Sequence, residues 1–175
     1  MLPKFNNILY CTDFSESSIN AFKYVVYLAK TTGADIHVLH VVEKLSTDAK
    51  ITLRYITNSD TRHKLLKERV KSATEILQER QDNFWNSLSV EDQALRVQIK
   101  SSQVIEAYPA ETILSVSKEI NTDVIIMGTH QRGVIHTFLG SITKSVLRSS
   151  LIPVLVVPAP KEKRKEKNKR ENTIK

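Results

Sequence analysis

The sequence is poor in cysteine, in glycine and in long apolar runs, and each scarcity excludes a class of protein. A single cysteine, Cys11, cannot form an internal disulfide, which argues against a disulfide-stabilised extracellular scaffold. No segment approaches the roughly 18 consecutive apolar residues that a membrane span requires, so we expect no membrane partner. The first residues also lack the layout of a signal peptide, and we therefore expect a cytoplasmic protein.

The positive charge is concentrated at the C-terminal end. The formal net charge is +7, but residues 160–175 alone hold eight Lys or Arg against three Glu, a net +5 that leaves +2 for residues 1–159. That segment contains no apolar residue before Ile174, a composition typical of disorder. We predict one domain over residues 1–158 and a basic, disordered tail over 159–175. Nucleic acid is not the expected partner, and binding through the tail is the weaker alternative.

Apolar runs that alternate with helical patterns predict the fold class. Continuous stretches of Val, Ile and Leu indicate strands covered on both faces, which is typical of a parallel sheet wrapped by helices. The prediction is an α/β, Rossmann-like protein with a single open five-stranded parallel sheet and helices on both faces. The strands are expected at residues 7–12, 35–42, 95–99, 123–127 and 153–158. Residues 44–60 show no clear periodicity of apolar residues, so we assign them no helix or strand.

Three of the only four glycines, Gly128, Gly133 and Gly140, fall inside one window of thirteen residues. This window joins an apolar strand to a helix that begins with Gly140 and Ser141. A helix N-terminus presents unpaired N–H groups and a positive dipole, and here it stands at the carboxyl end of the sheet, where open α/β folds bind ligands. The window therefore predicts an anion site for a group such as phosphate. The alternative is a surface loop with ordinary turn glycines.

Other chemistries find less support in the sequence. The loop is not a Walker A motif, because Val134 stands where lysine is required, and no Gly-x-Gly-x-x-Gly motif exists. His37 and His40 lie on a predicted strand, and no cysteine or paired carboxylate joins the loop histidines, so we expect no metal site. We identify no catalytic residue and no general base, and predict a protein that is not an enzyme, with slow ATP hydrolysis at most.

The residues around the glycine window resemble a known family. Residues 127–134 (MGTHQRGV), 138–148 (FLGSITKSVLR) and 152–157 (IPVLVV) resemble the C-terminal signature of universal stress proteins, and residues 8–18 resemble their first strand and turn. The similarity covers residues 4–158. It implies strand order 3-2-1-4-5 and a regulatory protein of the stress response that binds ATP or AMP, with or without Mg²⁺, and acts on an unknown regulated protein. It also implies a homodimer that pairs through the edge strand Val154–Val157.

The resemblance implies a set of nucleotide-binding residues. The end of the first strand would contact base and ribose, with Asp13 accepting hydrogen bonds from ribose hydroxyls; Asp13 is also a candidate N-cap of the next helix. The backbone at Val41 would hold the adenine, and the start of the last helix would bind the phosphates. The implied set is Thr12, Asp13, Val41, Met127, Gly128, Gly133, Gly140, Ser141 and Ile142.

One departure from the family pattern leaves two functions open. ATP-binding members carry Gly-x-x-Gly, nine residues, then Gly-Ser or Gly-Thr. Here Gln131 stands at the second glycine, and eight residues separate it from Gly140. A one-residue deletion would leave Gly133 in the role of the missing glycine. Otherwise the loop resembles that of the non-binding branch, and the chain is a nucleotide-free protein-interaction module of the same fold.

Overall fold

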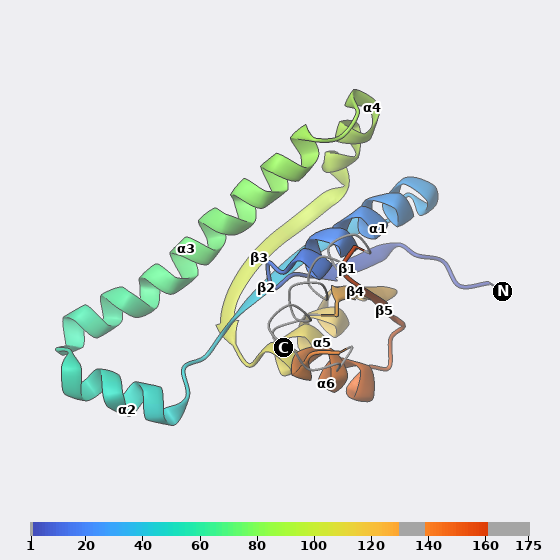
Figure 1. Ribbon diagram of the computed structural model, residues 1–175. Coiled ribbons are helices and arrows are strands. Elements are labelled where there is room, and N and C mark those ends of the chain that lie inside the picture. Colours follow the sequence, from blue (N-terminus) through green and yellow to red (C-terminus); the bar gives the residue numbers. More distant parts are fainter. Residues whose placement is uncertain (1, 130–138, 161–175) are drawn as a thin grey trace, which may run out of the picture.

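Five parallel strands form one sheet, in the order β3-β2-β1-β4-β5 (Figure 1). The structure is a computed structural model that describes residues 2–129 and 139–160. The order and the all-parallel pairing confirm the predicted fold class and the strand order implied by the resemblance. The strands are β1 (Asn7–Cys11), β2 (Asp35–Glu43), β3 (Ile99–Ala107), β4 (Val124–Gly128) and β5 (Val154–Val157).

Helices cover both faces of the sheet because side chains alternate along each buried strand. In β1, Ile8 and Tyr10 pack with α1 and α3, whereas Leu9 and Cys11 pack with α5 and α6. The chain thus has an apolar core on each side of the sheet. The helices are α1 (Glu16–Thr32), α2 (Thr47–Ile56), α3 (Ser59–Asn86), α4 (Val90–Gln93), α5 (Pro109–Glu119) and α6 (Ser141–Ser149), with a 3₁₀ turn, η1, at Ala94–Gln98.

The limits of α1 follow from local backbone chemistry. The helix begins after Ser15, whose side chain accepts a hydrogen bond from the Ser18 N–H, and ends at Gly33, which has the left-handed φ of 75° expected of a glycine C-cap. The interpretation of Asp13 as the N-cap is therefore wrong. Asp13 instead accepts the Ser15 N–H at 2.9 Å. A turn at Phe14, which has a positive φ, separates Asp13 from the N-cap, so the helix begins two residues later than Asp13 would place it.

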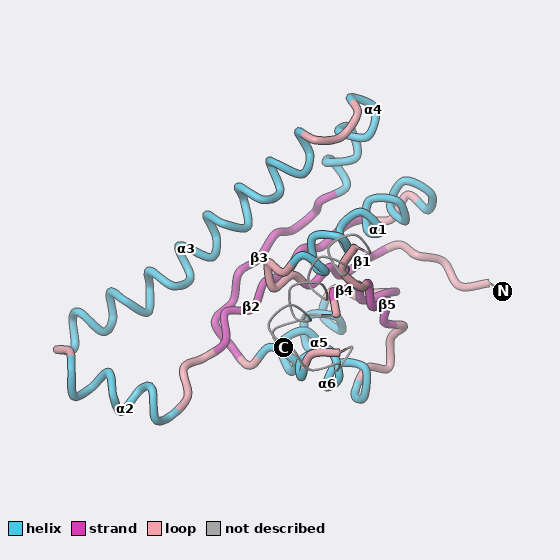
Figure 2. Tube along the Cα trace, viewed as in Figure 1, coloured by secondary structure: helices cyan, strands magenta, loops and turns pink. Residues whose placement is uncertain are grey.

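Two parts of the secondary structure differ from the prediction. The strand expected at 95–99 is wrong, because residues 94–98 form η1 and the strand begins at Ile99. β3 is an edge strand that includes Lys100 and Gln103, so its apolar signal is weak. Residues 47–56 form the helix α2, seen in cyan in Figure 2, which stands away from the sheet beside the first turns of α3. None of its described side chains is buried, which explains the missing apolar period.

Several predictions concern residues that the structure does not describe. Gly133 and Gln131 lie between the two described segments, and all but two residues of the predicted tail lie beyond residue 160. The loop register, the domain limit and the disorder of the tail therefore stay predictions. Within the described residues, no helix combines the length and the apolar character needed to cross a membrane.

Candidate functional site

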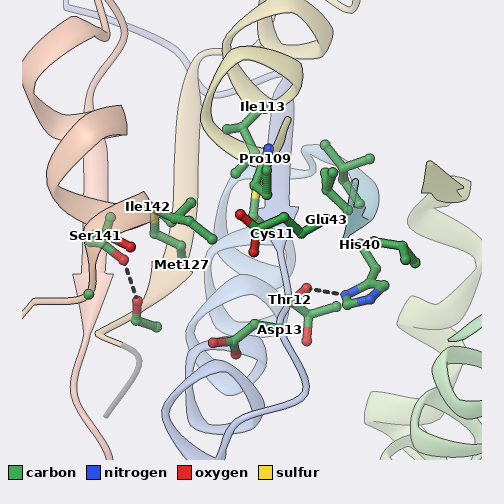
Figure 3. Close-up of a pocket in the computed structure, with 16 residues that line it drawn as sticks. Cys11, Thr12, Asp13, His40, Glu43, Pro109, Ile113, Met127, Ser141 and Ile142 are labelled. Carbon is green, nitrogen blue, oxygen red and sulfur yellow. Dashed lines mark hydrogen bonds between the residues drawn. The ribbon is translucent and has the colours of Figure 1, made fainter. Parts of the chain in front are cut away.

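A cavity of about 380 Å³ opens at the carboxyl ends of β1, β2 and β4 (Figure 3). The central strand β1 has β2 on one side and β4 on the other. The strand order therefore reverses at β1, and parallel α/β sheets commonly bind ligands at such a point. Eight of the nine implied binding residues line the cavity, and the ninth, Gly133, lies outside the described residues. The eight are Thr12, Asp13, Val41, Met127, Gly128, Gly140, Ser141 and Ile142.

The inner wall of the cavity is apolar. Cys11 and Met127 come from the ends of β1 and β4, and Ile113 comes from α5. Burial raises the pKa of the Cys11 thiol, so the sulfur stays protonated and unreactive at neutral pH. Pro109 and Ile113 had not been assigned to the site from the sequence. The signal available was the position of Pro109 in the first turn of the helix after β3, at the same edge of the sheet.

The N-terminus of α6 forms a second, polar wall. Gly140 is the N-cap, and no side chain of the described residues caps this helix. The first N–H groups of a helix find no acceptor inside it, so those of Ser141 and Ile142 bring positive partial charge to the cavity. Thr143 fixes the helix by donating from Oγ1 to the carbonyl of Gly128 at 3.2 Å. Gly140 has φ −66° and ψ 163°, values open to any residue, so its backbone conformation does not require glycine.

The turn after β1 supplies the third wall. The Thr12 N–H makes the last bond between β1 and β2, to the carbonyl of Leu39 at 3.0 Å. The Thr12 hydroxyl lies 3.1 Å from Oγ of Ser18 and accepts the Phe14 N–H, so it is committed to the turn. Asp13 follows, with its carboxylate on the cavity wall (Figure 3).

His40 joins this wall from β2, although the sequence had suggested no role for it. Its Nδ1 lies 2.7 Å from the carbonyl oxygen of Thr12. A carbonyl only accepts, so Nδ1 carries the proton and donates. Burial lowers the pKa of His40 below the ordinary 6.5, and the bond to Thr12 opposes this shift only in part. The ring is therefore neutral at pH 7, with Nε2 as an acceptor.

The cavity offers little to a metal ion. Among residues 2–129 and 139–160, no three His, Cys, Asp or Glu side chains gather in a way that could hold one. His130 and His136, the loop histidines, lie outside those residues. The described walls therefore combine an apolar slot, a helix N-terminus and two carboxylates, those of Asp13 and Glu43, which suits a flat apolar group joined to an anion through a hydroxylated linker.

Known proteins are similar to this chain in sequence and in fold. A family model described as the universal stress protein family matches residues 4–158. The chain is 27% identical over 158 residues to universal stress protein MJ0577 of Methanocaldococcus jannaschii, and the match covers 90% of this chain and 97% of the relative. The solved structure of MJ0577 has a TM-score of 0.63 to this one and covers 90% of this chain and 99% of that chain.

Two more distant structures share the fold and are described with a bound nucleotide. A universal stress protein in complex with cAMP has a TM-score of 0.57 at 18% identity, covering 90% of this chain and all of that chain (100%). A universal stress protein from Archaeoglobus fulgidus in complex with dAMP has a TM-score of 0.53 at 15% identity, covering 89% and 99%. At these identities the similarity shows the fold alone.

Proposed function

Because the chain belongs to the universal stress protein family, we propose that its cavity binds an adenine nucleotide, ATP or AMP, and that the protein is a cytoplasmic regulator in the stress response. The observation that carries this proposal is the convergence of Thr12, Val41 and Ser141, from three distant segments, on one cavity of about 380 Å³. That volume lies in the range of small-molecule sites. Family membership and the cavity support binding independently.

The adenine would be recognised by the vacant edge of β2. Asp35 donates its N–H to Asn6, and Leu39 accepts the Thr12 N–H, so alternate residues of β2 direct their backbone groups toward β1. The same alternation directs the N–H and C=O of Val41 to that side, beyond the end of β1. These groups can pair with N1 and the 6-amino group of adenine, while Met127 and Ile113 supply apolar contact.

The phosphates would lie at the N-terminus of α6. Its first N–H groups and helix dipole attract an anion, and Gly140 at the N-cap has no side chain of the kind that commonly accepts hydrogen bonds from such groups. Glycine at a position whose conformation does not need it supports a close approach of ligand to backbone. Mg²⁺, where present, would be held mainly by the phosphates and water, since this ion takes few protein ligands.

We expect binding rather than turnover. Three described side chains of the cavity wall could act as a general base: Asp13, His40 and Glu43. Asp13 and His40 each make a hydrogen bond within the β1–α1 turn or to it, and Glu43 is exposed at the last position of β2. Two proteins of this fold are described as complexes with cAMP and dAMP, which supports the capacity of the fold for adenine nucleotides. The regulatory output would be a change in contacts with a partner protein.

A homodimer is part of the proposal. Among residues 2–129 and 139–160, β5 pairs with β4 alone, and Leu155 is 36% exposed, so this part of the chain leaves an apolar strand edge open. Open apolar edges in native proteins are protected or paired. Pairing with the same strand of a second copy would cover both edges.

The purified protein is first extracted, and the extract is analysed for co-purified nucleotide. Isothermal titration calorimetry of the nucleotide-free protein with ATP and with AMP then tests the proposal. We expect a saturable, one-per-chain signal that Gly140→Asp abolishes, because a carboxylate would stand at the phosphate position. Ser149→Asp is the matched control, since it adds the same charge at the other end of α6. Absence of binding at millimolar nucleotide would contradict the proposal and favour the nucleotide-free interaction module.

A further inference from the structure

The turn that carries Asp13 is held in an unfavourable backbone conformation. Phe14 has φ of 62°, and Phe14 and Asn121 are the non-glycine residues with positive φ within the described part of the chain. A bulky side chain rarely adopts this region. Such a conformation persists only where surrounding contacts hold it, and it is common at functional sites. The contacts that hold Phe14 therefore decide where Asp13 stands.

The first of these contacts comes from β2. The His40 ring stacks on the Phe14 ring with centroids 4.1 Å apart and planes 23° from parallel. The same histidine donates from Nδ1 to the Thr12 carbonyl at 2.7 Å. His40 thus holds the turn on both sides of Asp13, at the backbone of Thr12 and at the ring of Phe14.

The second contact comes from the long helix α3. Arg80 donates from Nη1 to the carbonyl of Phe14 at 2.7 Å, and its guanidinium lies 5.3 Å from the centre of the Phe14 ring. A charged donor on a carbonyl and a cation on an aromatic face are both stabilising contacts. Arg80 lies 66 residues from Phe14 in sequence, and it does not line the cavity itself.

We infer that His40 and Arg80 are positioning residues that fix the strained turn at Phe14 and thereby hold the Asp13 carboxylate at the ribose of the bound nucleotide. The inference rests on the proposed function. Asp13 lies between two residues whose carbonyls are both bound from outside the turn, Thr12 by His40 and Phe14 by Arg80. Its carboxylate also accepts the Ser15 N–H at 2.9 Å, which orients the side chain once the turn is set.

The test compares ATP with 2′,3′-dideoxy-ATP, which lacks the ribose hydroxyls. Arg80→Ala should weaken ATP binding roughly 10- to 100-fold, the scale of one hydrogen bond to a charged group. It should leave the affinity for the dideoxy nucleotide within about twofold of wild type. Lys71→Ala, which removes an exposed pair with Glu75 on the same helix, is the control and should bind both ligands like wild type.

A double-mutant cycle adds a second readout. Asp13→Asn keeps an oxygen for the Ser15 N–H but loses the charge, and should weaken ATP binding on its own. Arg80→Ala should add no further loss in that background, since it acts through Asp13. His40→Leu should behave like Arg80→Ala, and His40→Asn, which retains a donor near the place of Nδ1, should recover part of the affinity.

The outcomes separate this inference from the proposed function. If wild-type protein binds no nucleotide, both fail. If wild type binds and Asp13→Asn weakens binding while Arg80→Ala does not, only the inference fails. Equal losses for ATP and the dideoxy nucleotide, or additive losses in the double variant, also overturn it. Should Arg80→Ala not fold, Phe14→Leu is the substitute variant, because it loses the stacking contact with His40 and the cation contact with Arg80. Unchanged ATP affinity in Phe14→Leu would overturn the inference.

Discussion

A Cβ atom placed on Gly128 would stand 2.5 Å from the backbone nitrogen of Ser18. The last residue of β4 thus touches the first turn of α1 with no room for a methyl group. Gly128 also gives its carbonyl to Thr143, so one residue links the sheet, α1 and α6. The sequence had suggested a ligand as the reason for this glycine, but packing against α1 already requires it.

Gly128→Ala should therefore lower the free energy of unfolding by about 1–3 kcal/mol, because the methyl group must displace backbone rather than a flexible side chain. Denaturant titration of the variant measures the effect. Gly33→Asn is the control, since Gly33 has open space around it and asparagine tolerates its positive φ. An alanine variant as stable as wild type would show that this contact is not as tight as described.

Adenine should be preferred to guanine. The N–H and C=O of Val41 match a base that offers an acceptor at N1 and a donor at position 6, whereas guanine reverses both. Guanine would leave buried polar groups unpaired, and we expect GTP to bind at least about tenfold more weakly than ATP. Competition of both nucleotides against a fluorescent ATP analogue measures the ratio. Equal affinities would exclude base recognition by this edge of β2.

Stability should fall as the pH is lowered toward 5. Burial lowers the pKa of both His37 and His40 in the folded protein below 6.5. The unfolded chain therefore takes up more protons as the pH drops through about 6.5, so the stabilisation present above that value is lost below it. Urea titrations between pH 7 and 5 should show this slope, and His40→Asn should flatten it. A stability that rises toward pH 5 would contradict the assignment.

Dimerisation through β5 predicts a specific effect of proline. Ile125 donates to Pro153 and Thr129 to Val157, so alternate residues of β5 face β4 and Val156 directs its backbone groups to the open edge. Val156→Pro should convert the dimer to a monomer with little loss of stability. Leu155→Pro, at a position facing β4, should instead destabilise the fold. Sedimentation equilibrium measures the change, and a monomeric wild type would contradict the proposal.

The sheet could be predicted because buried parallel strands leave long apolar runs. β4 is buried at all five positions, and its sequence shows it directly. β3 could not be placed as well, because an edge strand obtains its hydrogen bonds from one neighbour and keeps polar side chains such as Ser101 and Ser102. α2 was not predicted for a related reason, since none of its described side chains is buried and such a helix needs no apolar stripe.

Within the candidate site too, features that depend on local sequence could be predicted, and features that depend on tertiary packing could not. Glycine in a glycine-poor chain and a helix start at Gly140 are local signals, and they pointed to the cavity wall at the N-terminus of α6, where we propose that the phosphates bind. The contacts of Phe14 with His40 and Arg80 are not local, because they join residues on three separate elements. No spacing in the sequence predicts them, and the packing of α3 against β2 and β3 brings them together.

We propose that backbone N–H groups at the start of α6 and at the edge of β2 hold the nucleotide. Titration of ¹⁵N-labelled protein with ATP, followed by amide resonances, is the sharpest test. The largest shifts should fall on Gly140, Ser141, Ile142 and Val41 and should saturate together. Shifts confined to residues 160–175, or no shifts at millimolar ATP, would contradict it.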